Sequence, residues 1–221
     1  EAALLDPFLL LDDFHSDNPD DYMAGFPWHP HRGIETVTYV LKGMVEHGDS
    51  IGNKGIIKSG DVQWMTAGSG IIHQEMPRES NGIWGFQLWV NLPSSHKMMD
   101  PRYQNVIREK IPEVHIKQGV EIKVISGDVG EIKGPVMNLV VDSEYLDITM
   151  ASNTALEHPV NKGYKSFAYV IEGDGYFDTG KEVLIYSKHL VIFEDGDKVK
   201  IKAGDKGLRY LLISGKPIGE P

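Results

Sequence analysis

Apolar and polar residues alternate with a period of two in several short stretches of this chain. The alternation is clearest in Val120–Val124, Lys198–Lys202 and Thr36–Tyr39, and it predicts strands with one buried and one exposed face. Turn sequences separate such stretches at Gly43, Gly48-Asp49, Gly52-Asn53, Gly60-Asp61, Gly127-Asp128, Gly173-Asp174-Gly175 and Gly196-Asp197. Many short strands with frequent turns are typical of an all-β sandwich or barrel. The one helical element that we expect is a short turn near Ser94–Met99.

The second half of the chain resembles the first at a constant offset. The segment Glu35–Gly43 (ETVTYVLKG) has a counterpart in Lys165–Gly173 (KSFAYVIEG), and Ser59–Met65 has a weaker one in Ser187–Phe193. Two copies of strand, glycine turn and strand predict the duplication of one β-barrel unit, although any two β-hairpins share some features. The polar stretch 100–117, which contains two prolines, is the expected boundary. We therefore predict one domain at residues 1–110 and a second at residues 111–221.

Composition and charge exclude several kinds of function. The 221 residues include 32 acidic and 22 basic side chains, a formal net charge of −10, and no cysteine. Without cysteine, the chain has no disulfide framework, thiolate zinc site, iron–sulfur cluster or cysteine nucleophile. The negative charge and the lack of a basic stripe argue against direct binding of nucleic acid, because phosphate contacts require clustered lysine and arginine.

The segment that precedes Arg32 is acidic, and no long apolar segment follows it. Seven acidic residues precede Arg32, the first basic residue, whereas a signal peptide begins with positive charge. The longest apolar stretch, Ile83–Val90, is far shorter than the roughly 20 residues that span a bilayer. We expect a soluble, cytoplasmic protein without a membrane partner.

We also expect the acidic run Asp12–Asp21 to be a solvated loop, and His15 and His47 to be exposed to solvent.

Two short segments carry residues that can bind a metal ion. His29 and His31 stand at positions i and i+2, and so do His73 and Glu75. Residues i and i+2 of a strand project from the same face, so two such pairs on neighbouring strands would bring three imidazoles and one carboxylate together. That set suits a divalent first-row metal, and four protein ligands on an octahedral ion leave two positions open for catalysis. A single His-x-His pair is often only a surface feature.

The sequence around these two pairs resembles the pirin family of the cupin superfamily. The resemblance rests on HPHRGIETVTY at residues 29–39 and GDVQWMTAGSGIIHQEMP at residues 60–77, and it continues in QLWVNL at 87–92 and VISG at 124–127. It implies a bicupin, with two stacked cupin β-barrels (double-stranded β-helices). It further implies that His29, His31, His73 and Glu75 bind one iron(II), with manganese, nickel, copper or zinc as alternatives.

Two functions follow from the resemblance. Some pirin-like proteins open the flavonol quercetin with dioxygen and release carbon monoxide, as quercetin 2,3-dioxygenases do. In that reading the ligands are a small planar phenolic substrate and O2, and Glu75 is also the general base that takes the proton of the substrate hydroxyl. Other pirins are described as metal-dependent regulators that bind a protein partner without turnover. A third hypothesis is a sugar or small-molecule isomerase, since other cupins use similar ligands.

The second copy lacks the predicted metal ligands. At the offset that relates the two copies, Pro159 and Asn161 stand where the first copy has His29 and His31. The region that corresponds to His73 and Glu75 falls in a lysine-rich stretch at residues 198–202 without histidine. We therefore expect the second barrel to hold no metal and to have a structural or partner-binding role.

The sequence also places one more carboxylate and three aromatic residues near the predicted site. Strand alternation would put Glu35 on the ligand face, four positions after His31. The resemblance takes the carboxylate ligand from Glu75 instead, so we assign Glu35 to structure or to support of a ligand histidine. Trp84, Phe86 and Trp89 are expected to fill the barrel, with the alternative that some of them form apolar walls for a flat ligand.

Overall fold

The computed structural model describes residues 4–78, 81–117, 119–178, 180 and 183–221. Its elements are almost entirely strands, as the alternation predicts, and the chain divides between Lys110 and Ile111 into two compact units. Residues 4–6 group with the C-terminal unit, and residues 218–221 group with the N-terminal unit. In the described parts of the chain, no helix has the length and apolar character needed to cross a membrane.

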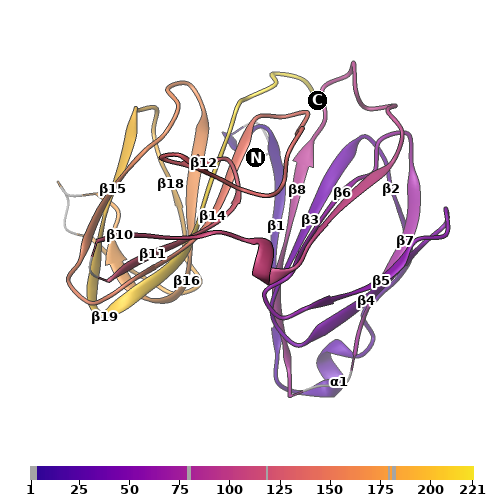
Figure 1. The fold of residues 1–221 in the computed structure, drawn as a ribbon, viewed down its shortest axis with the longest axis horizontal. Helices are drawn as coiled ribbons and strands as arrows, with labels where there is room; N and C mark the ends of the chain where they lie inside the picture. The colour runs from indigo at the N-terminus through magenta and orange to yellow at the C-terminus, as the bar shows by residue number, and fades with distance from the viewer. Residues whose placement is uncertain (1–3, 79–80, 118, 179, 181–182) are drawn as a thin grey trace. The chain divides into compact units, whose positions relative to one another are not determined.

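The N-terminal unit contains two antiparallel sheets. The five-stranded sheet has the order β1 (Phe8–Ser16), β8 (Ile83–Asn91), β3 (Ile34–Lys42), β6 (Val62–Thr66) and β9 (Arg102–Val106). The four-stranded sheet has the order β2 (Phe26–His31), β7 (Ile71–Pro77), β4 (Met44–Asp49) and β5 (Lys54–Lys58). Within this unit the two sheets face each other (Figure 1). Side chains that point inward from both sheets therefore share one interior.

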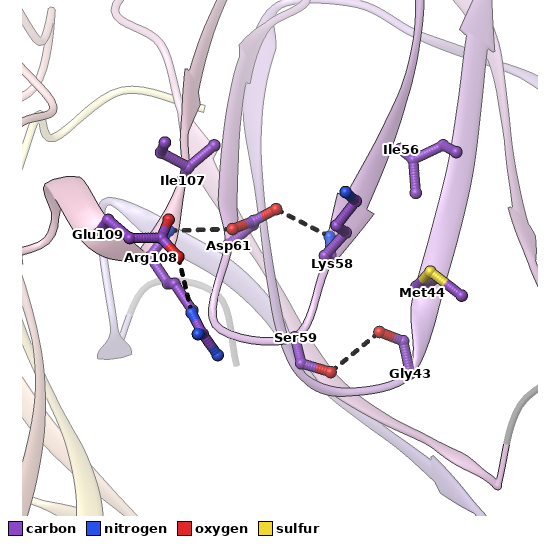
Figure 2. A pocket seen from close by; sticks show the side chains of 9 residues that line it. All are labelled: Gly43, Met44, Ile56, Lys58, Ser59, Asp61, Ile107, Arg108 and Glu109. Atoms are coloured by element: carbon purple, nitrogen blue, oxygen red, sulfur yellow. Dashed lines mark hydrogen bonds and ion pairs between the residues drawn. The ribbon is translucent and has the colours of Figure 1, made fainter.

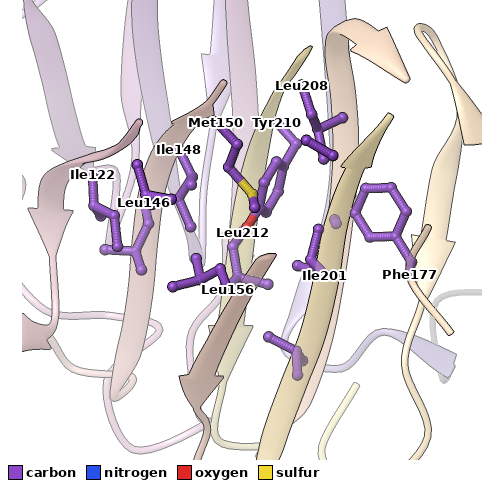
Figure 3. Packing of buried hydrophobic residues seen from close by; sticks show 14 of the residues in the cluster. Ile122, Leu146, Ile148, Met150, Leu156, Phe177, Ile201, Leu208, Tyr210 and Leu212 are labelled. Atoms are coloured by element: carbon purple, nitrogen blue, oxygen red, sulfur yellow. The ribbon is translucent and has the colours of Figure 1, made fainter. Parts of the chain in front are cut away.

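The C-terminal unit is built around the long strand β19 (Lys198–Gly215). Its main sheet has the order β10 (Glu113–Lys117), β11 (Val120–Ser126), β14 (Ser143–Met150), β19, β16 (Lys165–Tyr176) and β17 (Leu184–Tyr186). β15 (Ala155–Pro159) pairs with β19, β18 (Leu190–Ile192) pairs with β16, and β12 (Asp128–Val129) forms a small hairpin with β13 (Ile132–Lys133). The inward-facing residues are mostly aliphatic, including Ile122, Leu146, Ile148, Met150 and Leu212 (Figure 3). The interior of this unit is thus an apolar core.

The internal similarity of the sequence corresponds to equivalent strands. The segment 35–43 lies in β3 and the turn after it, and the segment 165–173 lies in β16. Each copy has a glycine with left-handed backbone at the same position, Gly43 with φ 87° and Gly173 with φ 76°, a conformation that favours glycine. β6 pairs with β3 as β18 pairs with β16. The two units therefore repeat the same pairing of strands, as expected for a duplication.

Of two local predictions, one was confirmed and one was wrong. The short turn expected near Ser94–Met99 is present, because residues 94–98 form successive turns in which the amides of His96 and Lys97 both donate to the Pro93 carbonyl. The acidic run 12–21 is not a loop, because β1 extends to Ser16 and a one-turn helix, α1 (Pro19–Tyr22), follows. The Asn18 side chain accepts a hydrogen bond from the Asp20 amide and so caps α1. Such a cap, with proline at the first helical position, favours a helix start over a loop.

Candidate metal centre

Three histidines from two neighbouring strands meet inside the N-terminal unit. β2 runs antiparallel to β7, and His29 lies directly opposite His73. The Nε2 atom of His29 is 3.0 Å from Nε2 of His31 and 3.0 Å from Nε2 of His73. One ring nitrogen from each of the three residues lies within 4.8 Å of the other two. The i, i+2 spacing of His29 and His31 thus places both on one face, as the sequence predicted.

The spacing of these nitrogens fits a divalent ion. Two nitrogens bound at right angles to an ion, each at about 2.1 Å, are about 3.0 Å apart. The Nδ1 atom of His29 lies 2.7 Å from the carbonyl oxygen of Pro27. If Nδ1–H donates to that carbonyl, the Nε2 lone pair of His29 is free to bind a metal. The arrangement can therefore accept a metal without reorienting this ring.

Burial keeps two of the imidazoles neutral. Burial, together with the neighbouring His29, lowers the pKa of His31 to about 4. Burial and the adjacent imidazoles lower the pKa of His73 to about 3. Neutral imidazole is the form that binds metal, so neither ring needs to lose a proton at neutral pH. The buried Nδ1 atom of His73 has no hydrogen-bond partner within the described parts of the chain.

Glu75 is on β7, two residues after His73, and its carboxylate is held by the facing sheet. Its side chain is buried, and its Oε1 accepts a hydrogen bond of 2.8 Å from the Thr38 hydroxyl. Its Oε2 accepts one of 2.6 Å from Nε2 of Gln87. Burial raises the pKa of the Glu75 carboxyl, while these two hydrogen bonds and the nearby His29 act in the opposite direction. The structure gathers the three imidazoles, and Glu75 as the fourth ligand remains a prediction.

Glu35 points away from the site, because it is on the face of β3 opposite to Thr38. It is fully buried and accepts hydrogen bonds from Oγ1 of Thr66 (2.6 Å) and Nε1 of Trp64 (3.0 Å). Strand alternation could not be extended from His31 to Glu35 because the chain turns at Gly33, with φ 70°, and passes from one sheet to the other. Glu35 therefore has a structural role, and its placement on the ligand face by strand alternation was wrong.

Sequence reasoning missed several residues that surround the site. His47 was expected to be exposed but is buried on β4 opposite Glu75, and Asp49 is buried opposite His73. These two residues have the same i, i+2 spacing as the ligand pairs, which could have identified them as inward-facing. Thr38 and Gln87 are directly opposite each other on β3 and β8. No local pattern showed that they would reach Glu75.

In the C-terminal unit, the histidine nearest to the expected position is paired with a carboxylate. Nε2 of the buried His158 lies 3.0 and 3.1 Å from the two carboxylate oxygens of Glu144. Elsewhere in the described chain, Glu113, His115 and Glu121 also come close together, but on the exposed surface of β10 and β11. Exposed charged groups of this kind are usually solvated. The cluster in the N-terminal unit is the stronger metal site, because two of its histidines, His31 and His73, are buried and burial lowers their pKa values.

A pocket of about 720 Å³ opens at the other end of β3, beyond Gly43 (Figure 2). Several of its polar groups are already paired. The oxygens of Asp61 accept hydrogen bonds from the backbone amides of Lys58 (3.0 Å) and Arg108 (2.9 Å), and the Ser59 hydroxyl donates to the Gly43 carbonyl. The Arg108 guanidinium pairs with Glu109 at 2.9 Å. These contacts stabilise the loop, so the pocket is a weaker candidate for chemistry than the histidine cluster.

Comparison with known proteins shows the family of this chain and agrees with its fold. The family model described as pirin matches residues 1–90, and the model of the pirin C-terminal cupin domain matches residues 145–221. Pirin-1 of Arabidopsis thaliana is 47% identical over the whole chain, which covers 76% of that protein. The chain belongs to the pirin family. The resemblance found in the sequence and the prediction of an all-β bicupin are thereby confirmed.

Two solved pirin-like structures are close in fold. Quercetin 2,3-dioxygenase from Acinetobacter baumannii is 32% identical, with a TM-score of 0.86, over 99% of this chain and 77% of that one. A bacterial pirin from Escherichia coli, solved in complex with nickel(II), is 26% identical, with a TM-score of 0.75, over 96% of this chain and 84% of that one. In this pirin, the histidine cluster of the N-terminal cupin domain is thus a potential metal site of unknown metal identity.

Proposed function

We propose that this pirin is a metal-dependent dioxygenase that opens a flavonol or another planar enol with O2. The observation that carries the proposal is the cluster of His29, His31 and His73. The buried Glu75 follows His73 by two residues on the same strand. The similarity to a quercetin 2,3-dioxygenase supports the reaction class and the planar phenolic substrate. The reaction consumes one O2 and releases one molecule of carbon monoxide.

The residues that would hold the metal are His29, His31, His73 and Glu75. With a divalent ion bound there, iron(II) or else manganese, nickel, copper or zinc, the site would offer Lewis acidity and open coordination positions for a substrate oxygen and dioxygen. The three neutral imidazoles and the carboxylate would carry one negative charge in total. They would therefore reduce the net charge of a divalent ion to +1, which favours binding of an anionic enolate.

Glu75 would also act as the general base. Each of its oxygens accepts one hydrogen bond, and a carboxylate oxygen has a further lone pair that can take a proton. Burial raises the pKa of Glu75, which makes its carboxylate a stronger base for the substrate hydroxyl. The proton taken from the substrate can return to the product when the ring has opened, so that Glu75 is again ionised.

Oxygen uptake tests this proposal. We expect protein loaded with iron(II) to consume O2 when quercetin is added, and Glu75→Gln to lose turnover to a greater extent than it loses metal. The matched control is Glu46→Gln on β4, where the exposed carboxylate pairs with Arg78; this variant should keep both metal and turnover. Equal loss of metal and turnover in Glu75→Gln would remove the assignment of the base.

The alternative function gives a different result in the same assay. No uptake by wild-type protein that holds one metal per chain would overturn the dioxygenase proposal for quercetin. Other planar enols would then be assayed, followed by capture of protein partners with and without metal. Binding that depends on metal, without turnover of any enol, would favour the regulatory module.

A further inference from the structure

The position of the Glu75 carboxylate is set by two side chains from the opposite sheet. Glu75 is on β7 in the four-stranded sheet, whereas Thr38 and Gln87 are on β3 and β8 in the five-stranded sheet. The Thr38 hydroxyl lies 2.8 Å from one Glu75 oxygen, and Nε2 of Gln87 lies 2.6 Å from the other. Each oxygen thus has its own donor, so the carboxylate is restrained in both position and rotation.

Trp89 determines which way the Gln87 amide points. Its indole Nε1–H lies 2.8 Å from Oε1 of Gln87. An indole nitrogen can only donate, so the atom it contacts has to be the amide oxygen, and the amide nitrogen has to point toward Glu75. Nε2 of Gln87 is also 3.3 Å from Oγ1 of Thr38. The Thr38 hydroxyl can accept that contact and donate its own proton to Glu75.

The same tryptophan packs against a histidine of the cluster. The rings of Trp89 and His31 are 5.0 Å apart between centroids and meet at 82°, in an edge-to-face arrangement. Trp89 and Gln87 stand at positions i and i+2 of β8 and are half-buried, so both side chains face the same interior. Trp89 therefore contacts His31 directly and Glu75 through Gln87.

We propose that Gln87 is a positioning residue for Glu75 and that the indole N–H of Trp89 fixes its orientation. Without that N–H, the Oε1 atom of Gln87 loses its donor, and the amide is held only by its contacts with Glu75 and Thr38. The amide can then shift, and the Glu75 carboxylate shifts with it. The part of this inference that concerns turnover rests on the proposed function, whereas the part that concerns the geometry of Glu75 does not.

The test removes the donor and keeps the ring. Trp89→Phe retains an aromatic ring against His31 but lacks the N–H, and Gln87→Met retains the approximate size of the side chain but lacks both polar atoms. The matched control is Trp84→Phe on the same strand, which loses an indole hydrogen bond of 3.0 Å to Asp13. All proteins would be loaded with cobalt(II), whose visible absorption spectrum reports on the ligands around the ion. Cobalt content would be measured in parallel.

We expect Trp89→Phe and Gln87→Met to bind one cobalt each and to change the cobalt spectrum, while Trp84→Phe keeps the wild-type spectrum. In the iron(II) protein the two site variants should lose about 10- to 100-fold in kcat, with a change in KM of less than about threefold. If one variant does not fold, the other decides the result. If quercetin is not a substrate of the wild-type protein, the proposed function fails, and the cobalt spectra alone test the positioning.

Two results would overturn the inference. One is a wild-type cobalt spectrum in both site variants, which would show that Glu75 keeps its place without Gln87. The other is loss of cobalt from Trp89→Phe while Gln87→Met retains a wild-type spectrum, which would show that Trp89 supports His31 alone.

Discussion

His29 and His73 lie directly opposite each other on β2 and β7, with their Nε2 atoms 3.0 Å apart. Successive residues of a strand point to opposite faces, so a shift of the pairing by a single position would turn one imidazole out of the interior. The register of two strands that are distant in the sequence therefore determines whether the histidine cluster forms.

Removal of His73 should abolish metal binding. The variant His73→Ala takes away one of the three clustered nitrogens. Removal of a residue that only supports a metal ligand typically lowers metal affinity by roughly 10- to 100-fold. We expect the affinity of His73→Ala for iron(II) or nickel(II) to fall by more than that. Metal content after dialysis and a binding titration would measure this. The exposed His96 provides the control, since His96→Ala should bind as the wild type does. Full metal content in His73→Ala would contradict the assignment of this site.

The contribution of His31 and His73 to the stability of the metal-free protein should fall as the pH drops below about 6.5. Burial lowers the pKa of His31 to about 4 and that of His73 to about 3, from the ordinary value of 6.5. Between pH 6.5 and 4 the unfolded chain therefore binds more protons than the native protein, and the free energy of unfolding decreases toward acid. Above pH 6.5 the contribution of the two histidines is fully retained. Each of the two histidines changes the free energy of unfolding by at most about 1.4 kcal/mol per pH unit.

Urea unfolding with a metal chelator at several pH values would measure this dependence. His73→Gln removes one titrating group, so we expect a smaller decrease between pH 6.5 and 4 than in the wild type. His96→Gln should have the wild-type slope, because its side chain is exposed. If His73→Gln and the wild type lose stability equally across this range, the imidazole of His73 is not kept neutral by the fold.

Glu35→Ala should lower stability and leave the metal centre intact. The Trp64 indole and the Thr66 hydroxyl both donate to the buried Glu35. Alanine would leave these two buried donors without an acceptor, at a cost of about 2–4 kcal/mol in the free energy of unfolding. Urea unfolding would measure that loss, and metal content should equal that of the wild type. A folded Glu35→Ala protein that has lost its metal would place Glu35 in the site after all.

One metal per chain is the expected stoichiometry. His158 in the C-terminal unit is buried against Glu144, so His158→Leu should bind as much metal as the wild type. The lost contact with Glu144 should lower the free energy of unfolding by about 1–3 kcal/mol. Metal analysis of the purified variant decides the question. Two metals in the wild type, one of which disappears in His158→Leu, would show that the second cupin domain also binds metal.

The sequence alone was sufficient for the fold class and for the close approach of His29, His31 and His73. Alternation predicted strands, the internal repeat predicted a duplicated unit, and the two i, i+2 pairs predicted histidines on shared inner faces. These features are local, because the backbone of one strand determines which of its side chains share a face. The family likewise followed from short motifs around His29, His73 and Glu75.

Only the tertiary structure decided what surrounds those residues. Strand alternation does not pass through a turn, which is why it placed Glu35 on the ligand face when the fold buries it on the other. Nor can it show which strands face each other across a barrel, so the contacts of Thr38 and Gln87 with Glu75 had no signal in the sequence. Pairing of strands and packing of sheets depend on contacts between distant segments. Those contacts determine which side chains hold the Glu75 carboxylate.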